Sequence, residues 1–468
     1  MAKGPRMTTT TEEGKSGSGR LSWAAIVGYG AGDAGNNLAF MMSTMFLLVY
    51  YTDVVGISAA AVGTMFLVLR VFDAFTDLVA GRVVDRVSTR WGKFRPFILF
   101  GSVPLLLLSV ATFNVPELGE SGALLYAYLT YAGLGVAYTL VNIPYGSLAA
   151  AMTQDSAERS KLSVARSLGS ATVAALLGAV LAPMLSKSND LQAIFTTATL
   201  AFVVVGTACY MFLFFTAKER VERAVPRVTL RQSYRVVKGN KPLALLCLSA
   251  LLLLSALMAK STAQIYLIRD VFDALHLMPF LSIGQLVVNF AVAPFVPRIV
   301  RRWGKRAAYI GSGLVAAGGG FVAFVAPNVW VAFTALMLSL PGLSLVTTII
   351  YALEADTVEY GEWKTGVRSE GTIYAVFSFT RKAGQAVGGA LGAYALALGG
   401  YVGSAMEQTT AAEWGIRAGA ALVPALLTLG AVLIMLAYPL TDKVHAKLVQ
   451  EIRQRRQDTN TDLHEESV

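Results

Sequence analysis

Long apolar runs separated by short polar stretches dominate this chain of 468 residues. A transmembrane helix needs about 17 to 25 predominantly apolar residues. Twelve runs meet this requirement: 22–50, 57–80, 96–115, 123–152, 162–185, 193–217, 242–268, 277–297, 307–326, 328–352, 372–398 and 414–438. The pattern predicts an all-α membrane protein with twelve transmembrane helices.

The polar connections between these runs predict which way the chain is oriented. Cytoplasmic loops of membrane proteins collect Lys and Arg. The connections after the second, sixth and eighth runs are basic, whereas those after the first, third and ninth contain no Lys or Arg. We therefore expect both chain ends in the cytoplasm and a multi-pass protein of the bacterial inner membrane. The first 20 residues hold no apolar segment typical of a signal peptide, so we expect no cleaved leader.

Composition supports the membrane assignment and narrows the chemistry. Hydrophobic residues make up 55% of the chain and charged residues 15%, against about 25% charged in soluble domains. The net charge of +10 follows from the cytoplasmic loops, so we predict no nucleic-acid partner. Cys209 and Cys247 lack metal-site spacing and the three histidines form no cluster, so we expect no metal and no cofactor besides a coupling ion.

The stretch GYGAGDAGNN at 28–37 has the glycine spacing of a dinucleotide-binding loop. Such a loop must follow a β-strand and open a helix in a soluble unit, and the first apolar run offers neither. We interpret the glycines as positions where membrane helices approach closely.

An internal repeat divides the chain into two halves. RWGKFR at 90–95 follows the second run and RWGKR at 302–306 follows the eighth, at the same place in each set of six. Two parallel six-helix halves are the architecture of major facilitator transporters. The expected organisation is an N-terminal tail (1–20), a first half (21–217), a basic cytoplasmic loop (218–241), a second half (242–438) and a cytoplasmic C-terminal tail (439–468).

Other membrane functions fit the sequence less well. The chain contains no GxxxxGK[ST] loop for an ATP-driven pump and no filter-like segment for a channel. It shows no nucleophile with a base, which argues against an enzyme, and no appended domain that would suit a non-transporting sensor. Secondary transport by a monomer in the lipid bilayer is the function that we expect.

Ionisable residues inside the apolar runs mark candidate sites, because each costs about 2.5–3.5 kcal/mol at the bilayer centre on insertion scales. Arg70, Asp73 and Asp77 occupy positions i, i+3 and i+7 on one helical face. They are candidates for a cation site, with an internal salt bridge as the alternative. Arg381 and Lys382 are adjacent in the eleventh run, and since neighbours point about 100° apart, at most one can face a central cavity directly.

Further polar positions are candidates for substrate binding, with helix-to-helix hydrogen bonding as the alternative. Asn142 and Tyr145 flank Pro144, which predicts either a broken helix that lines a site or a plain kink. The candidate substrate-binding residues are Asp33, Asn37, Asn142, Tyr145, Arg166 and Arg381.

The balance of interior charge predicts the kind of substrate. Three acids, Asp33, Asp73 and Asp77, face the bases Arg70, Arg166 and Lys382, even before Arg381 is counted. Binding one proton or cation would leave the cavity positive, which favours an anionic solute.

Charged residues in the polar connections are candidates for gating. We interpret EADTVEYGEWKTGVRSEG, after the tenth run, as a cytoplasmic loop that latches one half to the other, with a plain solvated loop as the alternative. The RWGK loops suit the same role, because breaking their ion pairs would let the halves rock. The candidate gating residues are Arg90, Lys93, Arg302, Lys305, Asp356 and Glu359.

A family resemblance rests on six motifs that occur in this order along the chain: YYTDVVG, VFDAFTDLVAG, TRWGKFRPF, LVNIPYGSL, EADTVEYGE and FSFTRKAGQAVGG. The chain resembles the glycoside-pentoside-hexuronide:cation symporters from about residue 28 to residue 443, and among them most closely the glucuronide-carrying branch. The resemblance implies that Asp73 and Asp77 coordinate the coupling cation with Lys382 in the same network, and that Arg166 lies at the sugar site.

Two departures from the related melibiose carriers are informative. Asn37 and Asn142 stand where those carriers use aspartates to hold galactoside hydroxyls, and an amide would not repel a uronate as a carboxylate would. Gly146 replaces their tryptophan, so the stacking platform is lost or moved. We expect symport of glucuronides or related uronides, with H⁺ favoured over Na⁺ because few carboxylates remain. Symport of neutral glycosides or pentosides with either ion is the alternative.

Overall fold

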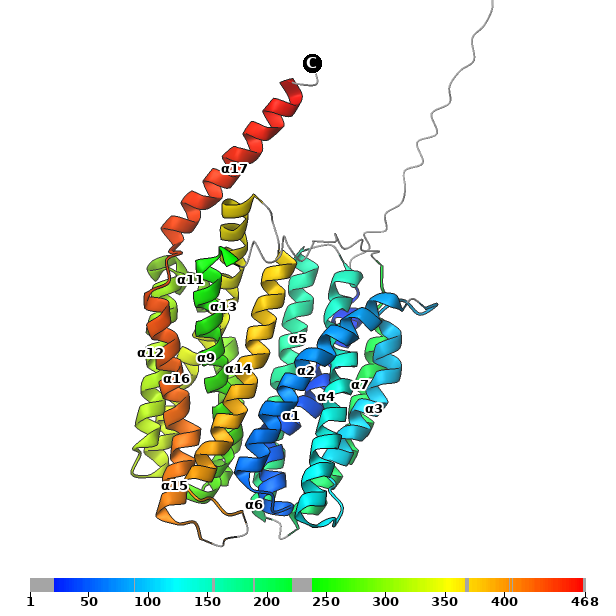
Figure 1. The fold of residues 1–468 in the computed structure, drawn as a ribbon, viewed down its shortest axis with the longest axis vertical. Helices are drawn as coiled ribbons and strands as arrows, with labels where there is room; N and C mark the ends of the chain where they lie inside the picture. The colour runs from blue at the N-terminus through cyan, green and yellow to red at the C-terminus, as the bar shows by residue number, and fades with distance from the viewer. Residues whose placement is uncertain are drawn as a thin grey trace, which may run out of the picture.

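The structure is a computed structural model that describes residues 21–87, 89–153, 156–187, 190–220, 238–366, 370–403, 405 and 407–465. Its regular elements in these ranges are all helices, and they run side by side in one bundle (Figure 1). The predicted N-terminal tail and residues 221–237 of the predicted basic loop lie outside the described residues.

The first half contains the helices of the first six apolar runs. They are α1 (Trp23–Val49) with the π-helical turn η1 (Tyr50–Val54), α2 (Ala59–Arg86), α3 (Arg95–Thr112), α4 (Gly119–Met152), α5 (Ser156–Leu176) with η2 (Leu177–Leu181) and α6 (Ala182–Lys187), and α7 (Leu191–Thr216). Polar caps fix several starts: Ser22, Ser58 and Asp190 each accept a hydrogen bond from a backbone N–H of the first turn.

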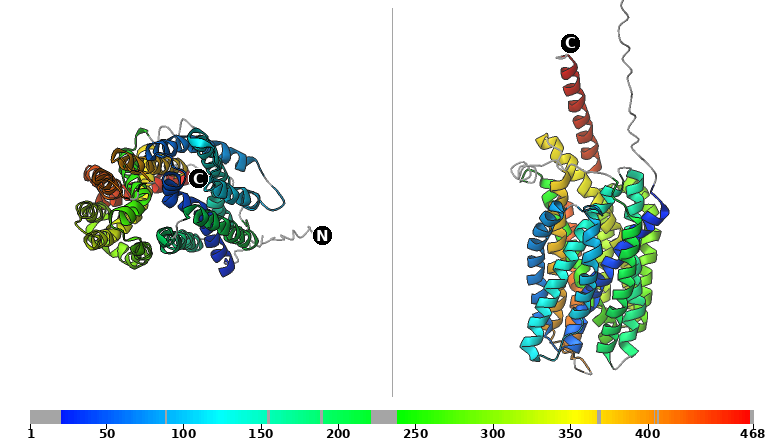
Figure 2. Two further views of the ribbon diagram at one scale, coloured as in Figure 1. Left: turned by 90° about the horizontal axis from the view of Figure 1, so that it is seen from below. Right: turned by 90° about the vertical axis from the view of Figure 1, so that its right-hand side faces the viewer.

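The second half follows the same order. Its helices are α9 (Lys241–Tyr266) with η3 (Leu267–Val271), η4 (Leu275–Leu277), α10 (Met278–Val292), η5 (Ala293–Phe295), α11 (Val296–Trp303), α12 (Lys305–Phe324), α13 (Val329–Thr365), α14 (Glu370–Leu398), and α15 (Thr410–Arg417) with η6 (Ala418–Leu422) and α16 (Val423–Leu436). Seen along the bundle in Figure 2, the second half, coloured green to red, lies beside the first.

Ten of the helical spans in the described residues are long and apolar enough to cross a membrane. They correspond to ten of the twelve predicted runs. The other two, 22–50 and 372–398, form α1 and α14 but are not among the ten. Asp33 and its neighbouring asparagines in α1, and Arg381 and Lys382 in α14, make these helices more polar.

One sequence expectation about local structure is wrong. EADTVEYGEWKT is the last part of α13, which ends at Gly366 in a left-handed conformation, and is not a loop. The predicted C-terminal tail forms the helix α17 (Asp442–Glu465), which projects beyond the bundle in Figure 1. At Pro144, where the sequence left a broken helix and a plain kink open, α4 continues without a break to Met152.

The end of the bundle that carries α17 and both RWGK loops is called the basic end here, and the opposite end the far end. Buried apolar clusters differ between these ends. At the far end a single cluster unites both halves, with Phe46 and Met65 from the first and Tyr266 and Ala393 from the second. Toward the basic end each half has a cluster of its own. Buried apolar packing between the halves is therefore concentrated at the far end, whereas toward the basic end each half has apolar clusters of its own.

Matched clamps at the basic end confirm that the RWGK loops are equivalent. The Glu219 carboxylate, just after α7, accepts hydrogen bonds from the backbone N–H groups of Lys93, Phe94 and Arg95 at 2.9, 2.8 and 3.2 Å. In the second half Asp442, just after α16, accepts from the Lys305 N–H at 2.8 Å. Each carboxylate satisfies free N–H groups at a helix start.

The arginines of the two motifs complete the clamps. Arg95 donates to the Phe214 carbonyl near the end of α7 at 2.6 Å. Arg306 donates to the Met435 carbonyl near the end of α16 at 3.1 Å. In each half the third helix is thereby tied to the sixth, which favours movement of each half as a unit.

We expect Glu219→Gln to destabilise the protein by about 1 kcal/mol, because a neutral amide is a weaker acceptor for N–H groups at a helix start. Thermal unfolding of the purified protein in detergent would measure this. Glu117→Gln is the control, since Glu117 is an exposed acid in another interhelical connection. Equal melting temperatures for both variants would contradict the clamp.

Candidate functional site

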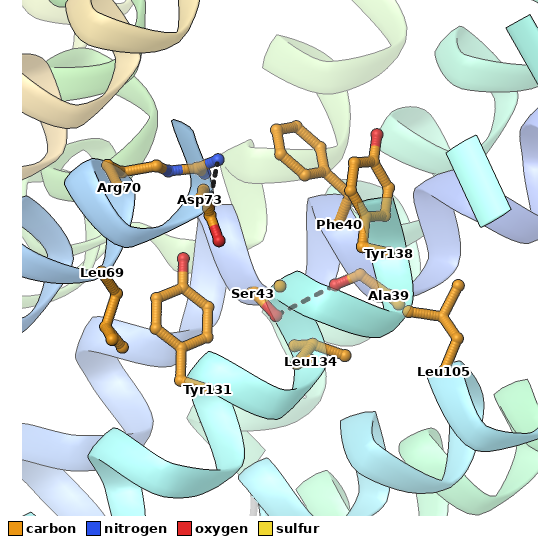
Figure 3. A pocket seen from close by; sticks show the side chains of 11 residues that line it. Ala39, Phe40, Ser43, Leu69, Arg70, Asp73, Leu105, Tyr131, Leu134 and Tyr138 are labelled. Carbon is orange, nitrogen blue, oxygen red and sulfur yellow. Dashed lines mark hydrogen bonds and ion pairs between the residues drawn. The ribbon is translucent and has the colours of Figure 1, made fainter. Parts of the chain in front are cut away.

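A cavity of about 430 Å³, part of it open to solvent, lies between α1, α2, α3 and α4. Figure 3 shows Arg70 and Asp73 on one side of it and the rings of Phe40 and Tyr138 on the other. These rings stack with centroids 5.3 Å apart, and the Arg70 guanidinium lies 5.6 Å from the Phe40 ring centre. The cavity thus combines a charged wall with an aromatic wall, as sites for small polar ligands commonly do.

The four predicted cation-site residues lie together. Arg70 forms an ion pair of 3.6 Å with Asp73. Asp77 forms an ion pair with Lys382 of α14, which links the two halves. Thr139 of α4 donates to Asp77 at 2.9 Å, and Asp73 packs against Gly135 one turn away, where a larger residue would collide with it. Each carboxylate of α2 therefore has a basic partner and a contact with α4 that fixes its position.

A second polar cluster joins α1 to α5. Asp33 is almost fully buried and pairs with Arg166 at 3.1 Å, whereas the Arg166 side chain is 43% exposed. Asn37 donates to Asp33 Oδ2 at 2.9 Å, and Ser170 hydrogen-bonds to the same oxygen. Asn37 also lies 3.0 Å from the Ser170 hydroxyl. A buried carboxylate thus fixes one side of Arg166 and leaves the rest of the guanidinium accessible to a ligand.

Tyr145 does not have the role that the sequence suggested. It is fully buried, its ring stacks on Tyr29 at 4.7 Å, and its hydroxyl donates to the Tyr29 carbonyl at 2.8 Å. The Arg166 guanidinium lies 5.5 Å from the Tyr145 ring centre. Packing between α1 and α4 leaves no surface of the Tyr145 ring open to a substrate. Tyr145 therefore acts as a packing support for the Arg166 guanidinium.

The other predicted substrate residues are separated. Asn142 is half-buried and makes no hydrogen bond to another described residue. Arg381 donates to the Tyr351 hydroxyl of α13 at 3.2 Å, while its neighbour Lys382 pairs with Asp77. The two adjacent bases thus point to different helices, as helical geometry requires.

Sequence reasoning missed several residues of the cavity wall. Phe40, Ser43, Tyr131 and Tyr138 line it, and Tyr138 lies within electrostatic reach of Asp33, Arg166, Arg70 and Arg381. Their spacing was the available signal: Phe40 and Ser43 lie one and two turns beyond Asn37, and Tyr131 and Tyr138 lie on the helix of Asn142. An aromatic residue in an apolar run does not stand out, so charge alone drew attention.

In this structure the candidate gating residues Lys305, Asp356 and Glu359 pair within the second half and the helix that follows it. Lys305 pairs with Asp356 at 2.6 Å, and His445 of α17 contacts Asp356 at 3.6 Å and pairs with Glu359. All these residues belong to the second half and the helix that follows it. Arg90 lies over the ring of its neighbour Trp91 at 4.6 Å, and Lys93 contributes its backbone N–H to the clamp of the first half. Arg302 is exposed.

The polar link between the halves at the far end was not predicted. Arg269, in η3, pairs with Asp53 of η1 at 2.5 Å and with its own neighbour Asp270 at 2.8 Å. Tyr401 accepts from Arg269 at 2.9 Å and donates to Asp53 at 3.0 Å. This far-end lock, Asp53, Arg269, Asp270 and Tyr401, uses equivalent turns of the two halves, since both π-helical turns end in Asp-Val. The shared Asp-Val was the signal that could have revealed it.

Comparison with known proteins identifies the family. A family model described as MFS/sugar transport protein matches residues 28–442. The chain belongs to this family. The prediction of a glycoside-pentoside-hexuronide:cation symporter is also confirmed. The chain has the major facilitator fold, and as a member of this family it is a sugar transporter of the membrane and not an enzyme.

Individual relatives cover almost the whole chain. The glucuronide carrier protein homolog of Escherichia coli K12 is 44% identical over 93% of this chain and 97% of its own. A putative 2,3-dihydroxypropane-1-sulfonate exporter of Salmonella typhimurium is 33% identical, with 93% and 97% covered. The crystal structure of the nucleoside transporter NupG shares the fold of this sugar transporter, with a TM-score of 0.64, 12% identity and coverage of 88% and 98%.

We expect Arg166→Ala to destabilise the protein by about 2 kcal/mol, because it removes the cation from the buried Asp33 carboxylate. The double variant Asp33→Asn, Arg166→Ala should recover most of this loss, since no buried charge then lacks a partner. Thermal unfolding of the three proteins would measure the coupling. A double variant as unstable as the sum of both single changes would show that the two residues act independently.

Proposed function

We propose that the protein imports a glucuronide or related uronide together with a proton, by alternating access. The observation that carries this proposal is the arrangement around Arg166. Asp33, which is itself held by Asn37 and Ser170, pairs with one side of its guanidinium, and the rest of the Arg166 side chain is accessible. A guanidinium binds a carboxylate in a planar, bidentate geometry, which gives orientation as well as affinity.

The surrounding charges support an anionic substrate. Asn37 is a neutral hydrogen-bonding group, and the Asn142 amide makes no hydrogen bond with another described residue. One relative is named for a glucuronide and another for a sulfonate, which are both organic anions. The hydroxyls of a neutral glycoside could also accept hydrogen bonds from the exposed part of Arg166, but a carboxylate would accept stronger, charge-assisted ones.

The contacts of the two carboxylates on α2 support a proton as the coupling ion. Asp73 and Asp77 already have basic partners, Arg70 and Lys382, so few oxygen atoms remain free to surround Na⁺. A proton needs only one carboxylate oxygen. Protonation of Asp77 would release Lys382, and with it the ion pair that joins α2 to α14. This gives the coupling ion a direct effect on the contact between the halves.

We propose that the basic end faces the cytoplasm and that the structure is the inward-facing state. The shared apolar cluster and the far-end lock hold the halves together on the outer side. Toward the basic end the apolar clusters are separate. Rocking of the halves would open the lock and close the basic end, with the clamps keeping each half intact.

Proteoliposomes that contain the purified protein should accumulate an aryl β-glucuronide when an inward proton gradient is imposed, and the matching aryl β-glucoside much less. Asp73→Asn and Asp77→Asn should each reduce gradient-driven accumulation by about tenfold or more, because a neutral amide cannot bind the coupled proton. Asp273→Asn is the control, since Asp273 is exposed outside the cavity. Equal uptake of the glucoside would contradict the uronide assignment, and uptake driven only by a sodium gradient would contradict proton coupling.

Arg269→Gln should shift the protein toward the state that is open at the far end. It removes charge-assisted hydrogen bonds worth about 1.5–3 kcal/mol each. Spin labels at Ala60 and Val402, exposed positions of the two halves, should then report longer distances, measured with Cys209 and Cys247 replaced by serine. Arg417→Gln is the matched control, because Arg417 donates only to carbonyls of its own half. A distance distribution unchanged by Arg269→Gln would contradict the lock.

A further inference from the structure

We propose that Lys260, with the cavity that it lines, is a second subsite for the carboxylate of the transported uronide, in addition to Arg166. This inference rests on the proposed function and extends it to the second half. Lys260 lies toward the end of α9, before η3, and lines a cavity of about 400 Å³, part of it open to solvent, between α9, α12, α13 and α16. Ser339 and Thr428 face the same cavity from α13 and α16.

Lys260 is the exception among the cations inside the apolar spans, of which Arg381 donates to the Tyr351 hydroxyl. Arg70, Arg166 and Lys382 each pair with a carboxylate. Lys260 makes no hydrogen bond or ion pair with any part of the chain that the structure describes. The parts of α12, α13 and α16 that line its cavity contain no Asp or Glu. The described residues of the second half therefore supply no partner for this ammonium.

An unpaired ammonium in a transmembrane helix is costly, about 2.5–3.5 kcal/mol at the centre on insertion scales, and such residues usually serve a function. The cost is removed when an anion enters the cavity. The Ser339 and Thr428 hydroxyls already donate to carbonyls of their own helices, which leaves their oxygen atoms as acceptors for sugar hydroxyls. The ammonium then remains as the group for a carboxylate, and the neighbouring oxygens for the rest of a sugar.

The repeat gives Lys260 an equivalent in the cavity of the first half. When the two π-helical turns are aligned on their Asp-Val pairs, Lys260 corresponds to Ser43, because each precedes its aspartate by the same number of residues. Ser43 lines the cavity that contains Arg70 and Asp73 (Figure 3). Equivalent positions on α1 and α9 thus line a cavity in each half, and the second half carries a cation where the first carries a hydroxyl.

The test is binding to the purified, full-length protein, measured by calorimetry with 4-nitrophenyl β-D-glucuronide and with the matching glucoside. Lys260→Met should raise the Kd of the glucuronide about tenfold or more, as expected for loss of a charge-assisted hydrogen bond. The Kd of the glucoside should stay within about twofold. Lys260→Arg, which keeps the charge, should retain most of the preference for the glucuronide.

Lys241→Met is the matched control, because Lys241 is an exposed lysine at the start of the same helix. It should change neither Kd. Thermal unfolding of each variant identifies a protein that has lost its fold, and in that case Lys260→Gln replaces Lys260→Met.

The possible results of these measurements distinguish an error in the role of Lys260 from an error in the proposed function. Equal weakening of glucuronide and glucoside would mean that Lys260 is structural, and an unchanged glucuronide Kd would mean that the carboxylate binds elsewhere. Stabilisation of the wild type but not of Lys260→Met by chloride, with the glucuronide Kd unchanged, would assign the site to an inorganic anion. Each of these results overturns the inference alone. Failure of the wild type to bind the glucuronide would instead overturn the proposed function.

Discussion

The constraint on which this structure depends is that a charge inside an apolar bilayer must find a partner. Asp33, Asp73 and Asp77 each meet a base on another turn or another helix, and these pairs determine how α1, α2, α5 and α14 face one another. Apolar packing discriminates less between alternative arrangements of the helices, because lipid tails are as apolar as leucine side chains. The polar pairs therefore define both the interior of the protein and the places where a ligand or a proton can compete.

Different polar contacts stabilise the inside of each half and the boundary between the halves. Within each half, a carboxylate caps the start of the third helix and an arginine ties it to the sixth. Across the boundary, the described ionic contacts are Asp77 with Lys382 and Asp53 with Arg269. One of them contains a carboxylate proposed to bind the coupling proton. The protein thus consists of two stable units joined by few polar contacts that can break.

The distribution of charge between the halves is uneven, and this bears on the substrate. In the first half three acids face two bases, and Lys382 of the second half supplies the third base. In the second half Lys260 faces its cavity without a partner among the described residues. An anionic sugar that reached both Arg166 and Lys260 would supply the missing negative charge. Substrate recognition and approach of the two halves would then depend on the same electrostatic interaction.

The sequence by itself determined the fold class, the repeat, the family and most of the charged residues. Hydropathy and charge are local properties of a helix, and Arg70, Asp73 and Asp77 share a face because helical periodicity is fixed. Only the tertiary structure decided which helices meet. It buried Tyr145 under Arg166, extended α13 so that Asp356 and Glu359 contact their own half and α17, and placed Arg269 between two equivalent aspartates. These outcomes depend on packing between segments far apart in the chain, which no local pattern specifies.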